Sequence, residues 1–283
     1  MESSALVKQL ASNSRVVREE AFESLRKYLA TRQFKEGKQL QFDKLWKGLY
    51  FSMWFSDRPR PQQRLADSLA ELHLLYFSPA DNRAGHKAAL TGNDAAFIKF
   101  SKAFWRIICL EWYGIDHHRL DKYLLLVRRV LNAQLRYLQS REWQPELVTT
   151  YIFAVLRKLP LSGSKKVYNG IPFHIIDILL DEWEKLVFNE DDLYEGEDND
   201  DEQNSVRKQE LIAATPLNEF LDIFQDLSSN TNNIKVLRDK IKEDIFGDAR
   251  LKEWGVGPSA LRECGEDDND DEDEDDEDEW NGF

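Results

Sequence analysis

The sequence predicts an all-α protein in which antiparallel helix pairs stack side by side, in the manner of HEAT or armadillo arrays. Apolar residues recur at positions i, i+4, i+7 and i+11 in four separate segments, and the alternation typical of strands is sustained nowhere. Turn residues separate these segments, and short turns between helices favour antiparallel neighbours. Because no fixed-period repeat is visible, a compact irregular helical bundle stays open as the alternative.

Each apolar stripe predicts the buried face of one helix. The four stripes consist of Leu65, Leu69, Leu72 and Tyr76; of Leu120, Leu124, Val127 and Leu131; of Val148, Ile152, Val155 and Leu159; and of Ile176, Leu180, Trp183 and Val187. A related set, Phe97, Phe100, Phe104 and Ile107, predicts a further helix. Other helices are expected over residues 14–32, 42–55, 216–227 and 233–246.

Capping and turn residues set the expected helix boundaries. Asn13 and Ser14 can cap the helix that follows them, and Pro61 suits the first position of the helix that carries the Leu65 stripe. Gly114 can close the helix before it. Thr215-Pro216 is expected to be a cap and first-turn pair.

Charge is distributed unevenly and divides the chain into four expected parts. Residues 1–189 hold 29 Lys and Arg against 20 Asp and Glu, so we expect a basic helical body there. Residues 190–202 hold 9 acidic residues and no basic one, which predicts a disordered acidic loop. A C-terminal helical part is expected at 203–264. Residues 265–283 predict a disordered acidic tail, because 13 acidic residues stand in it without a basic one.

The composition excludes several protein classes. Cys109 lies in an apolar helical run and Cys264 beside the acidic tail, so no disulfide framework is implied. No run approaches the ~18 consecutive apolar residues of a membrane span, and residues 1–15 lack the apolar segment of a secretion signal. We therefore expect a soluble, reduced intracellular protein without membrane contact. Its basic body and separate acidic tracts favour a ribonucleoprotein environment over a generic acidic enzyme.

No set of residues has the spacing of a catalytic, cofactor or metal site, so none is predicted. The dense carboxylates lie in the acidic tracts, which cannot preorganise a two-cation nuclease site. A helix cap explains Asp116, and a salt-bridge partner explains Asp121. His117 and His118 point to different faces of a helix and make a poor chelate. The segment 162–166 lacks the upstream glycine of a phosphate-binding loop and indicates a flexible basic turn.

Basic residues on the expected helices and turns are the predicted contacts for RNA phosphates or partner proteins. The candidates are Lys44, Lys47, Arg58, Arg60 and Arg64; Arg128, Arg129 and Arg136; and Arg157, Lys158, Lys165 and Lys166. Each phosphate contact adds roughly one unit to the salt dependence of binding. For any single cation, a solvated face or an ion pair with a nearby carboxylate is the simpler interpretation.

Tryptophans divide into two groups by their sequence neighbours. The expected core tryptophans, which fall on or beside apolar stripes, are Trp46, Trp54, Trp105, Trp112 and Trp183. Trp143 and Trp254 lie next to charged residues and turns, so they are candidates for exposed partner anchors. Core or edge packing is the simpler interpretation for both.

Three separated motifs resemble the ribosomal RNA processing protein 1 family. The first comprises KLWKGL, MW and SDRP within residues 44–59. The second comprises EWYGID and RLDKY within residues 111–123, and the third comprises GIPFH and LDE within residues 170–182. The resemblance spans most of residues 5–189 in the same order. The chain is similar to the short fungal form, because it ends in acidic residues in place of the long basic extension of animal members.

The resemblance implies a non-catalytic assembly factor of the nucleolus and nucleus that uses no cofactor and no small-molecule substrate. It implies binding to early pre-60S ribosomal particles and to other assembly factors, including Brix-domain and β-propeller proteins, with pre-rRNA as a further partner. Two alternatives stay open. One is a metal-dependent RNase in pre-rRNA processing, and the other is an acidic chaperone for basic ribosomal proteins.

Overall fold

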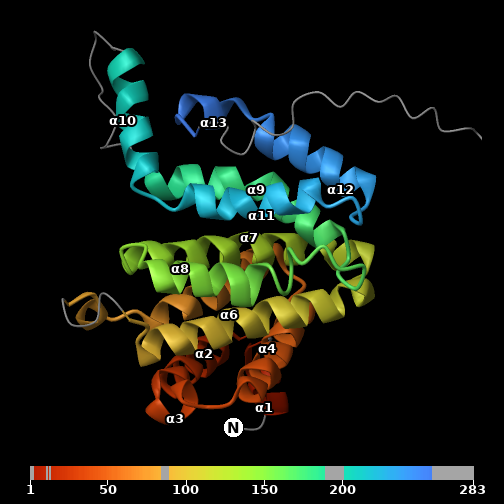
Figure 1. The fold of residues 1–283 in the computed structure, drawn as a ribbon. Helices are drawn as coiled ribbons and strands as arrows, with labels where there is room; N and C mark the ends of the chain where they lie inside the picture. Colours follow the sequence, from red (N-terminus) through yellow and green to blue (C-terminus); the bar gives the residue numbers. More distant parts are fainter. Residues whose placement is uncertain (1–2, 11, 13, 84–88, 189–200, 257–283) are drawn as a thin grey trace, which may run out of the picture.

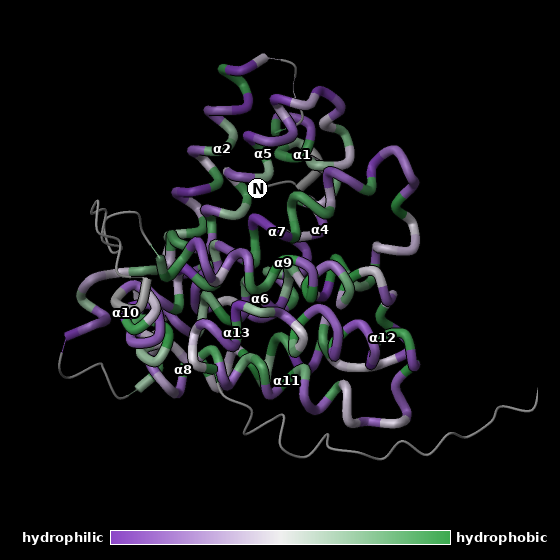
Figure 2. Tube along the Cα trace, turned by 90° about the horizontal axis from the view of Figure 1, so that it is seen from above, coloured by the Kyte–Doolittle hydropathy of each residue, from purple (hydrophilic) through white to green (hydrophobic). Residues whose placement is uncertain are grey.

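The computed structural model describes residues 3–10, 12, 14–83, 89–188 and 201–256 of the chain. Within these ranges every regular element is helical and no strand occurs, which confirms the all-α prediction. Figure 1 shows the helices stacked in chain order, from the helices of residues 3–54 at one end to those of residues 201–253 at the other. In Figure 2 hydrophilic and hydrophobic residues alternate along the helices, as expected when each helix buries one face.

The N-terminal layer consists of four helices whose apolar faces meet. They are α1 (Ser3–Leu10), α2 (Arg15–Ala30), α3 (Arg32–Lys35) and α4 (Gln39–Trp54). α1 packs against both α2 and α4. α4 also lies along α6 of the next layer, so the N-terminal layer continues into the middle of the molecule.

The middle of the stack contains the longest helices. Its elements are α5 (Pro59–Glu71), the 3-10 turns η1 (Leu72–Tyr76) and η2 (Pro79–Asn82), α6 (Gly92–Glu111), the 3-10 turn η3 (Trp112–Gly114), α7 (His117–Ser140), α8 (Pro145–Tyr151) and the π-helical turn η4 (Ile152–Leu156). α5 packs along α7, and α6 contacts α8 and η4. α6 and α7 therefore have neighbours on more than one side.

The C-terminal part adds a last layer on α7. Its elements are α9 (Gly170–Val187), α10 (Asp201–Ala213), α11 (Leu217–Ser229), α12 (Lys235–Lys240), the π-helical turn η6 (Ile241–Phe246) and α13 (Ala249–Glu253). α9 packs against α7 on one side and against η6 on the other, while α10 contacts α13. α9 thus lies between α7 and the elements that follow it in the chain.

The predicted apolar stripes form the core. Every residue of the Leu65, Phe97 and Ile176 stripes is buried, and in the remaining two stripes only Leu120, Leu124 and Leu159 are half-buried. One hydrophobic cluster runs from Leu6 to Trp254 without interruption. The core is therefore continuous across the boundary expected between residues 1–189 and 203–264.

Several helix boundaries differ from the sequence expectation. α5 begins at Pro59, which takes the first helical position in place of Pro61, because Pro59 already lacks the N–H that this position leaves unpaired. Pro216 stands at the N-cap position of α11, and the Thr215 hydroxyl donates to the Ile212 oxygen (2.7 Å) instead of capping. Gly114 ends a 3-10 turn that follows α6.

Other expectations fall partly or wholly on undescribed residues. Ser14 occupies the N-cap position of α2 but makes no side-chain cap bond, and Asn13 lies outside the described residues. α10 begins at Asp201, inside the range expected to be an acidic loop. The rest of that loop, residues 257–264 of the C-terminal part and the whole acidic tail lie outside the described residues.

A buried ion pair locks α6 to α7. Asp94 (0% exposed side chain) accepts from Arg141 (1%) at 3.0 and 3.1 Å and from the Tyr137 hydroxyl at 2.9 Å. Asp94 also completes a capping box with Thr91 at the start of α6. Arg141 donates further to the backbone oxygen of Asp81 (2.6 Å) in η2. A buried charge pair persists when its remaining polar atoms are satisfied, and here they are.

A second buried polar group links η1, α6, α7 and α8. His73 donates from Nδ1 to the Ala70 oxygen (3.0 Å) and accepts at Nε2 from Gln134 (3.0 Å). The Gln134 oxygen in turn accepts from Trp105 (2.9 Å) and from Tyr151 (2.6 Å). Burial lowers the pKa of His73 to about 3, so the ring is neutral at neutral pH.

Replacing Asp94 by Asn should lower the free energy of unfolding by about 3 to 5 kcal/mol, because the buried Arg141 loses its counter-charge. Urea denaturation followed by circular dichroism measures the change. As the control, Arg15→Gln removes only an exposed pair with Glu19 and should leave the midpoint unchanged. A loss below about 1 kcal/mol for Asp94→Asn would contradict this account.

Acid should destabilise the protein through His73. The folded-state pKa of about 3 lies below the unfolded value of ~6.5, so the unfolded chain takes up this proton first as the pH falls. The contribution of neutral His73 is complete above pH ~6.5 and declines towards pH 3. The unfolding free energy of the wild type should therefore fall more steeply below pH 6.5 than that of His73→Gln, by at most ~1.4 kcal/mol per pH unit. Parallel slopes in urea titrations would refute the assignment.

Candidate partner- and RNA-binding surface

The first two family-like motifs meet where α4 ends and α7 begins. Lys122, whose side chain is 4% exposed, donates to the backbone oxygens of Trp54 (2.8 Å) and Ser56 (3.0 Å) and so caps the end of α4. Burial is the main cause that lowers the pKa of Lys122. The Tyr123 hydroxyl donates to the Tyr50 oxygen (2.9 Å), and the two rings stack at 4.7 Å. These motif residues brace one helix against another.

The flanking charges of the same motifs are also engaged within the fold. Asp116 takes the N-cap position of α7, and its side chain pairs with Arg119. The hydrogen bond from Arg119 is the main cause that lowers the pKa of Asp116. The Arg119 guanidinium lies 4.6 Å from the centre of the Trp54 ring, and Lys47 pairs with Glu111 between α4 and α6. Asp116 thus stands at the expected cap position, but its side chain makes no cap hydrogen bond and binds Arg119 instead.

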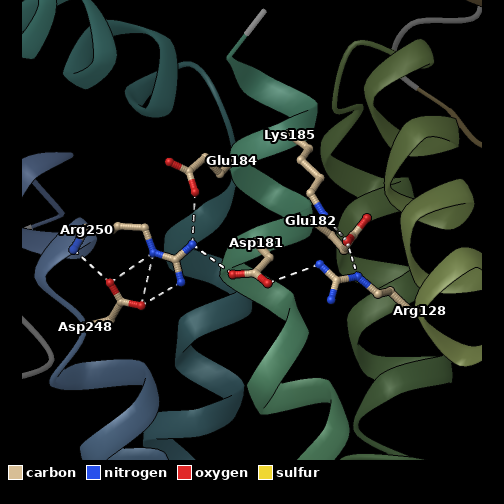
Figure 3. A network of polar contacts seen from close by, with 7 residues as sticks. All are labelled: Arg128, Asp181, Glu182, Glu184, Lys185, Asp248 and Arg250. Atoms are coloured by element: carbon tan, nitrogen blue, oxygen red, sulfur yellow. Dashed lines mark hydrogen bonds and ion pairs between the residues drawn. The ribbon is translucent and has the colours of Figure 1, made fainter. Parts of the chain in front are cut away.

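The acidic pair of the third motif joins the C-terminal part to α7, as Figure 3 shows. Glu182, with a side chain 4% exposed, accepts from Arg128 of α7 (2.6 Å). Asp181 accepts from Arg128 (3.1 Å) on one side and from Arg250 of α13 (3.0 Å) on the other. Arg250 also binds Asp248 (2.7 Å), which lowers the pKa of Asp248 and raises that of Arg250. This cluster fastens α13 onto α9 and α7.

Five of the twelve predicted cations form ion pairs that bridge elements of the stack. They are Lys47 with Glu111, Arg128 with Asp181 and Glu182, Arg129 with Asp67 (3.0 Å), Arg136 with Glu71 (2.5 Å) and Arg157 with Asp226. These five side chains are held by carboxylates of neighbouring elements. The ion-pair interpretation therefore holds for these five side chains. Each of them would have to leave its carboxylate partner before it could bind a phosphate.

The other seven predicted cations are exposed and make no ion pair with any residue of the described part of the chain. They are Lys44, Arg58, Arg60, Arg64, Lys158, Lys165 and Lys166. The three arginines stand on one short stretch, because Arg58 is the N-cap residue of α5 and the other two lie on its first turns. Lys158, Lys165 and Lys166 lie on the connection between η4 and α9. Among the described residues, the seven cations thus comprise two separate groups of three and Lys44, which lies on α4.

A cleft of about 870 Å³ lies beside the arginine group, between α2 and α5. Arg64 lines it from α5, and Arg26 lines it from α2. Phe22 and Leu10 supply apolar surface, while acidic side chains such as Glu23 share the rim. Apolar walls with charges of both signs suit a protein segment better than a nucleic-acid backbone.

The tryptophan expectation needs correction. Trp254 is 2% exposed and packs against the Phe188 ring at 5.6 Å, so it is a core residue and no exposed anchor. Trp143 is half-buried and stacks on Trp183 at 5.4 Å. Their charged sequence neighbours do not predict exposure, because packing partners come from distant helices. The five tryptophans expected in the core are buried or half-buried.

The described residues contain no group of three or more His, Cys, Asp or Glu side chains that could hold a metal ion. His117 and His118 lie edge to face with ring centres 5.2 Å apart. The Nε2 of His174 donates a hydrogen bond to the backbone oxygen of Leu124 (2.9 Å). Cys109 is buried, which raises the pKa of its thiol to about 12. Within the described ranges no helix is long and apolar enough to cross a membrane.

Sequence reasoning misses two exposed tyrosines, Tyr113 (65% exposed) and Tyr168 (46%), whose rings contact at 5.2 Å. Tyr113 belongs to the EWYGID motif, and its position next to Gly114 at the end of a helix is the one sequence feature that indicates its exposure. Tyr168 lies in an irregular segment, and nothing in the sequence indicates that it meets Tyr113.

The described residues form a stack of helices that carries exposed cations without an ion-pair partner among them. A family model described as "Nucleolar protein, Nop52" matches residues 1–282, and the chain belongs to this family of nucleolar proteins.

Relatives confirm the resemblance drawn from the three motifs. The chain is 34% identical over 181 residues to human ribosomal RNA processing protein 1 homolog B, a match that covers 63% of the chain and 22% of the relative. It is 29% identical over 245 residues to the mouse homolog A, covering 85% and 42%. It is 30% identical over 190 residues to the Drosophila melanogaster homolog, covering 65% and 25%. The chain therefore aligns with less than half the length of each of these relatives.

Replacing Arg250 by Met should release α13 from the joint while the rest of the stack stays folded. Arg250 binds Asp181, Glu184 and Asp248, so its loss removes the ion pairs drawn for α13 in Figure 3 and leaves only the backbone N–H of position 250 donating to Asp248. Amide hydrogen exchange of residues 249–256 should become roughly tenfold faster. Lys252→Met, on the same helix and without an ion pair to any described residue, should leave the exchange rate unchanged. Unaltered exchange in Arg250→Met would refute the role of the joint.

Proposed function

We propose that the chain is a non-catalytic scaffold of early pre-60S particles in the nucleolus. It supports pre-rRNA processing by binding other assembly factors and pre-rRNA while separate enzymes cut the RNA. Membership of a family of nucleolar proteins supports this, and so do relatives named for ribosomal RNA processing. The Brix-domain and β-propeller proteins implied by the family resemblance are the proposed assembly-factor partners.

The observation that carries the proposal is the division of the cations into two kinds. Cations such as Arg128 and Arg136 are used to fasten helices to one another, whereas Arg58, Arg60 and Arg64 are exposed and unpaired within the described structure. Keeping three like charges together costs electrostatic energy in the free protein. A polyanion or an acidic partner surface relieves that repulsion on binding.

The proposed mechanism is positional. A continuous core connects the arginine group on α5 with the C-terminal helices, so partners bound at different layers are held in a fixed arrangement. The motifs shared with the family serve this purpose, because they brace α4 against α7 and α9 against α7.

Reversing Arg58, Arg60 and Arg64 to Glu should weaken association with precursor particles without unfolding the protein, since none of the three makes an ion pair in the described structure. Co-sedimentation of the tagged protein with large-subunit precursors measures association, and circular dichroism measures folding. We expect a loss of roughly tenfold or more, because three phosphate or carboxylate contacts are reversed.

The matched control is Arg83→Glu, Lys242→Glu and Lys252→Glu, which changes the net charge equally at exposed positions elsewhere. It should co-sediment like the wild type. Unchanged co-sedimentation of the arginine variant would remove this surface from the proposal. Magnesium-dependent cleavage of precursor RNA by the purified protein, abolished by one carboxylate substitution, would refute the non-catalytic role.

A further inference from the structure

A small hollow of about 250 Å³ opens where the connection between η4 and α9 meets the start of α12. We call it the tyrosine hollow; it is lined by Tyr113, Tyr168, Lys165, Asn232 and Asn233, among others. Figure 1 shows α12 and the loops before α9, which carry several of these lining residues, at the same side edge of the stack. It is distant in sequence from the arginine group on α5.

The two tyrosines offer aromatic surface to solvent. Tyr113 is 65% and Tyr168 46% exposed, and their rings meet edge to face with interplanar angle 81° and centres 5.2 Å apart. An edge-to-face contact covers one face of one ring at most, and both residues stay exposed. Exposed aromatic faces are where unstacked bases of single-stranded nucleic acid bind, largely without regard to base identity.

The backbone around the hollow is fixed by close packing. Gly163 adopts a φ of +66°, and a Cβ there would lie 2.6 Å from the side-chain oxygen of Asn233. Asn233 is buried and donates to the Leu227 oxygen (2.8 Å), so it cannot move aside freely. A Cβ at Gly170 would lie 2.9 Å from the Tyr168 ring. The backbone at both glycines therefore lies too close to its neighbours to admit a side chain.

The charge around the hollow is positive. Lys165 lines it, and Lys158 and Lys166 are exposed on the same connection; none of the three forms an ion pair with a described residue. No carboxylate is among the described residues that line it. The amide groups of Asn169 and Asn232 are exposed there and can donate to and accept from base edges.

We infer that the tyrosine hollow binds a single-stranded RNA segment, with one unstacked base against Tyr113 and Tyr168 and the neighbouring phosphates on Lys165 and Lys166. This inference rests on the proposed function and adds to it the form of the RNA and the place where it binds. A protein partner would favour charges of both signs at the rim, as in the α2–α5 cleft, and the hollow lacks them. A duplex hides its base faces and cannot use the rings.

Fluorescence anisotropy with a short unstructured oligoribonucleotide and the full chain tests the inference. Tyr113→Ala with Tyr168→Ala should weaken binding about tenfold or more, and the corresponding Phe variants should stay within about twofold because stacking needs only the rings. Lys165→Glu with Lys166→Glu should reduce the slope of log affinity against log salt by about 1.4, at ~0.7 per contact on a single strand. Lys242→Glu with Lys252→Glu, which carries the same charge change, should not alter the slope.

As the folding control, circular dichroism must show equal helical content for all variants.

A second test does not depend on removing a side chain. A photo-crosslinking residue placed at position 168 should capture RNA in isolated precursor particles. Capture of protein alone, unchanged affinity of the Ala variants, or equal loss in the Phe and Ala variants would overturn the inference. The two proposals can be tested separately. If the tyrosine variants bind RNA like the wild type while the α5 arginine variant still loses its association with precursor particles, the inference is refuted and the proposed scaffold function stands.

Discussion

The stack depends on one buried ion pair, Asp94 with Arg141. It closes the start of α6 against the end of α7, and through Arg141 it also holds the η2 turn. α4 packs on α6, while α5 and α9 pack on α7, so the layers on both sides take their positions from these two helices. Removing two charges from water is costly, and the pair is tolerated because Tyr137 and the backbone oxygen of Asp81 complete its bonding. These bonds join α6, α7 and η2 at one point of the stack.

The residues that make the family recognisable are mostly structural. Lys122 and Tyr123 tie α7 to the end of α4, and Glu182 with Asp181 ties α9 to α7 and α13. Family motifs in this chain therefore mark joints between layers. Arg58 and Tyr113, which belong to the surfaces proposed to bind partners and RNA, are exposed residues of the first and second motifs. A joint and a proposed binding surface thus occupy the same short stretch of chain.

The fold was predictable because helical periodicity is a local signal, and the stripes ending at Tyr76, Ile107 and Val187 are buried throughout. The candidate surface was predictable only in part. The sequence names the cations but does not say which are paired, since the carboxylates of Arg136 and Arg157 lie 65 and 69 residues away. For Trp254 the sequence leaves an exposed anchor and core packing both open, because Phe188, the residue after α9 that packs against its ring, is distant in sequence. Pro59 and Pro61 suit the same position, and only the observed N-cap at Arg58 decides between them.

The uninterrupted core from Leu6 to Trp254 has a mechanical consequence. Under the proposed function, the core of the described residues connects α5 with α12 and acts as a spacer between two places where partners bind. A partner that engages both places must itself present contacts at the matching distance, and a misassembled precursor would engage only one of them. Two modest affinities combine into tight binding only on a target whose two contacts have the matching spacing, so the fixed spacing selects correctly assembled targets.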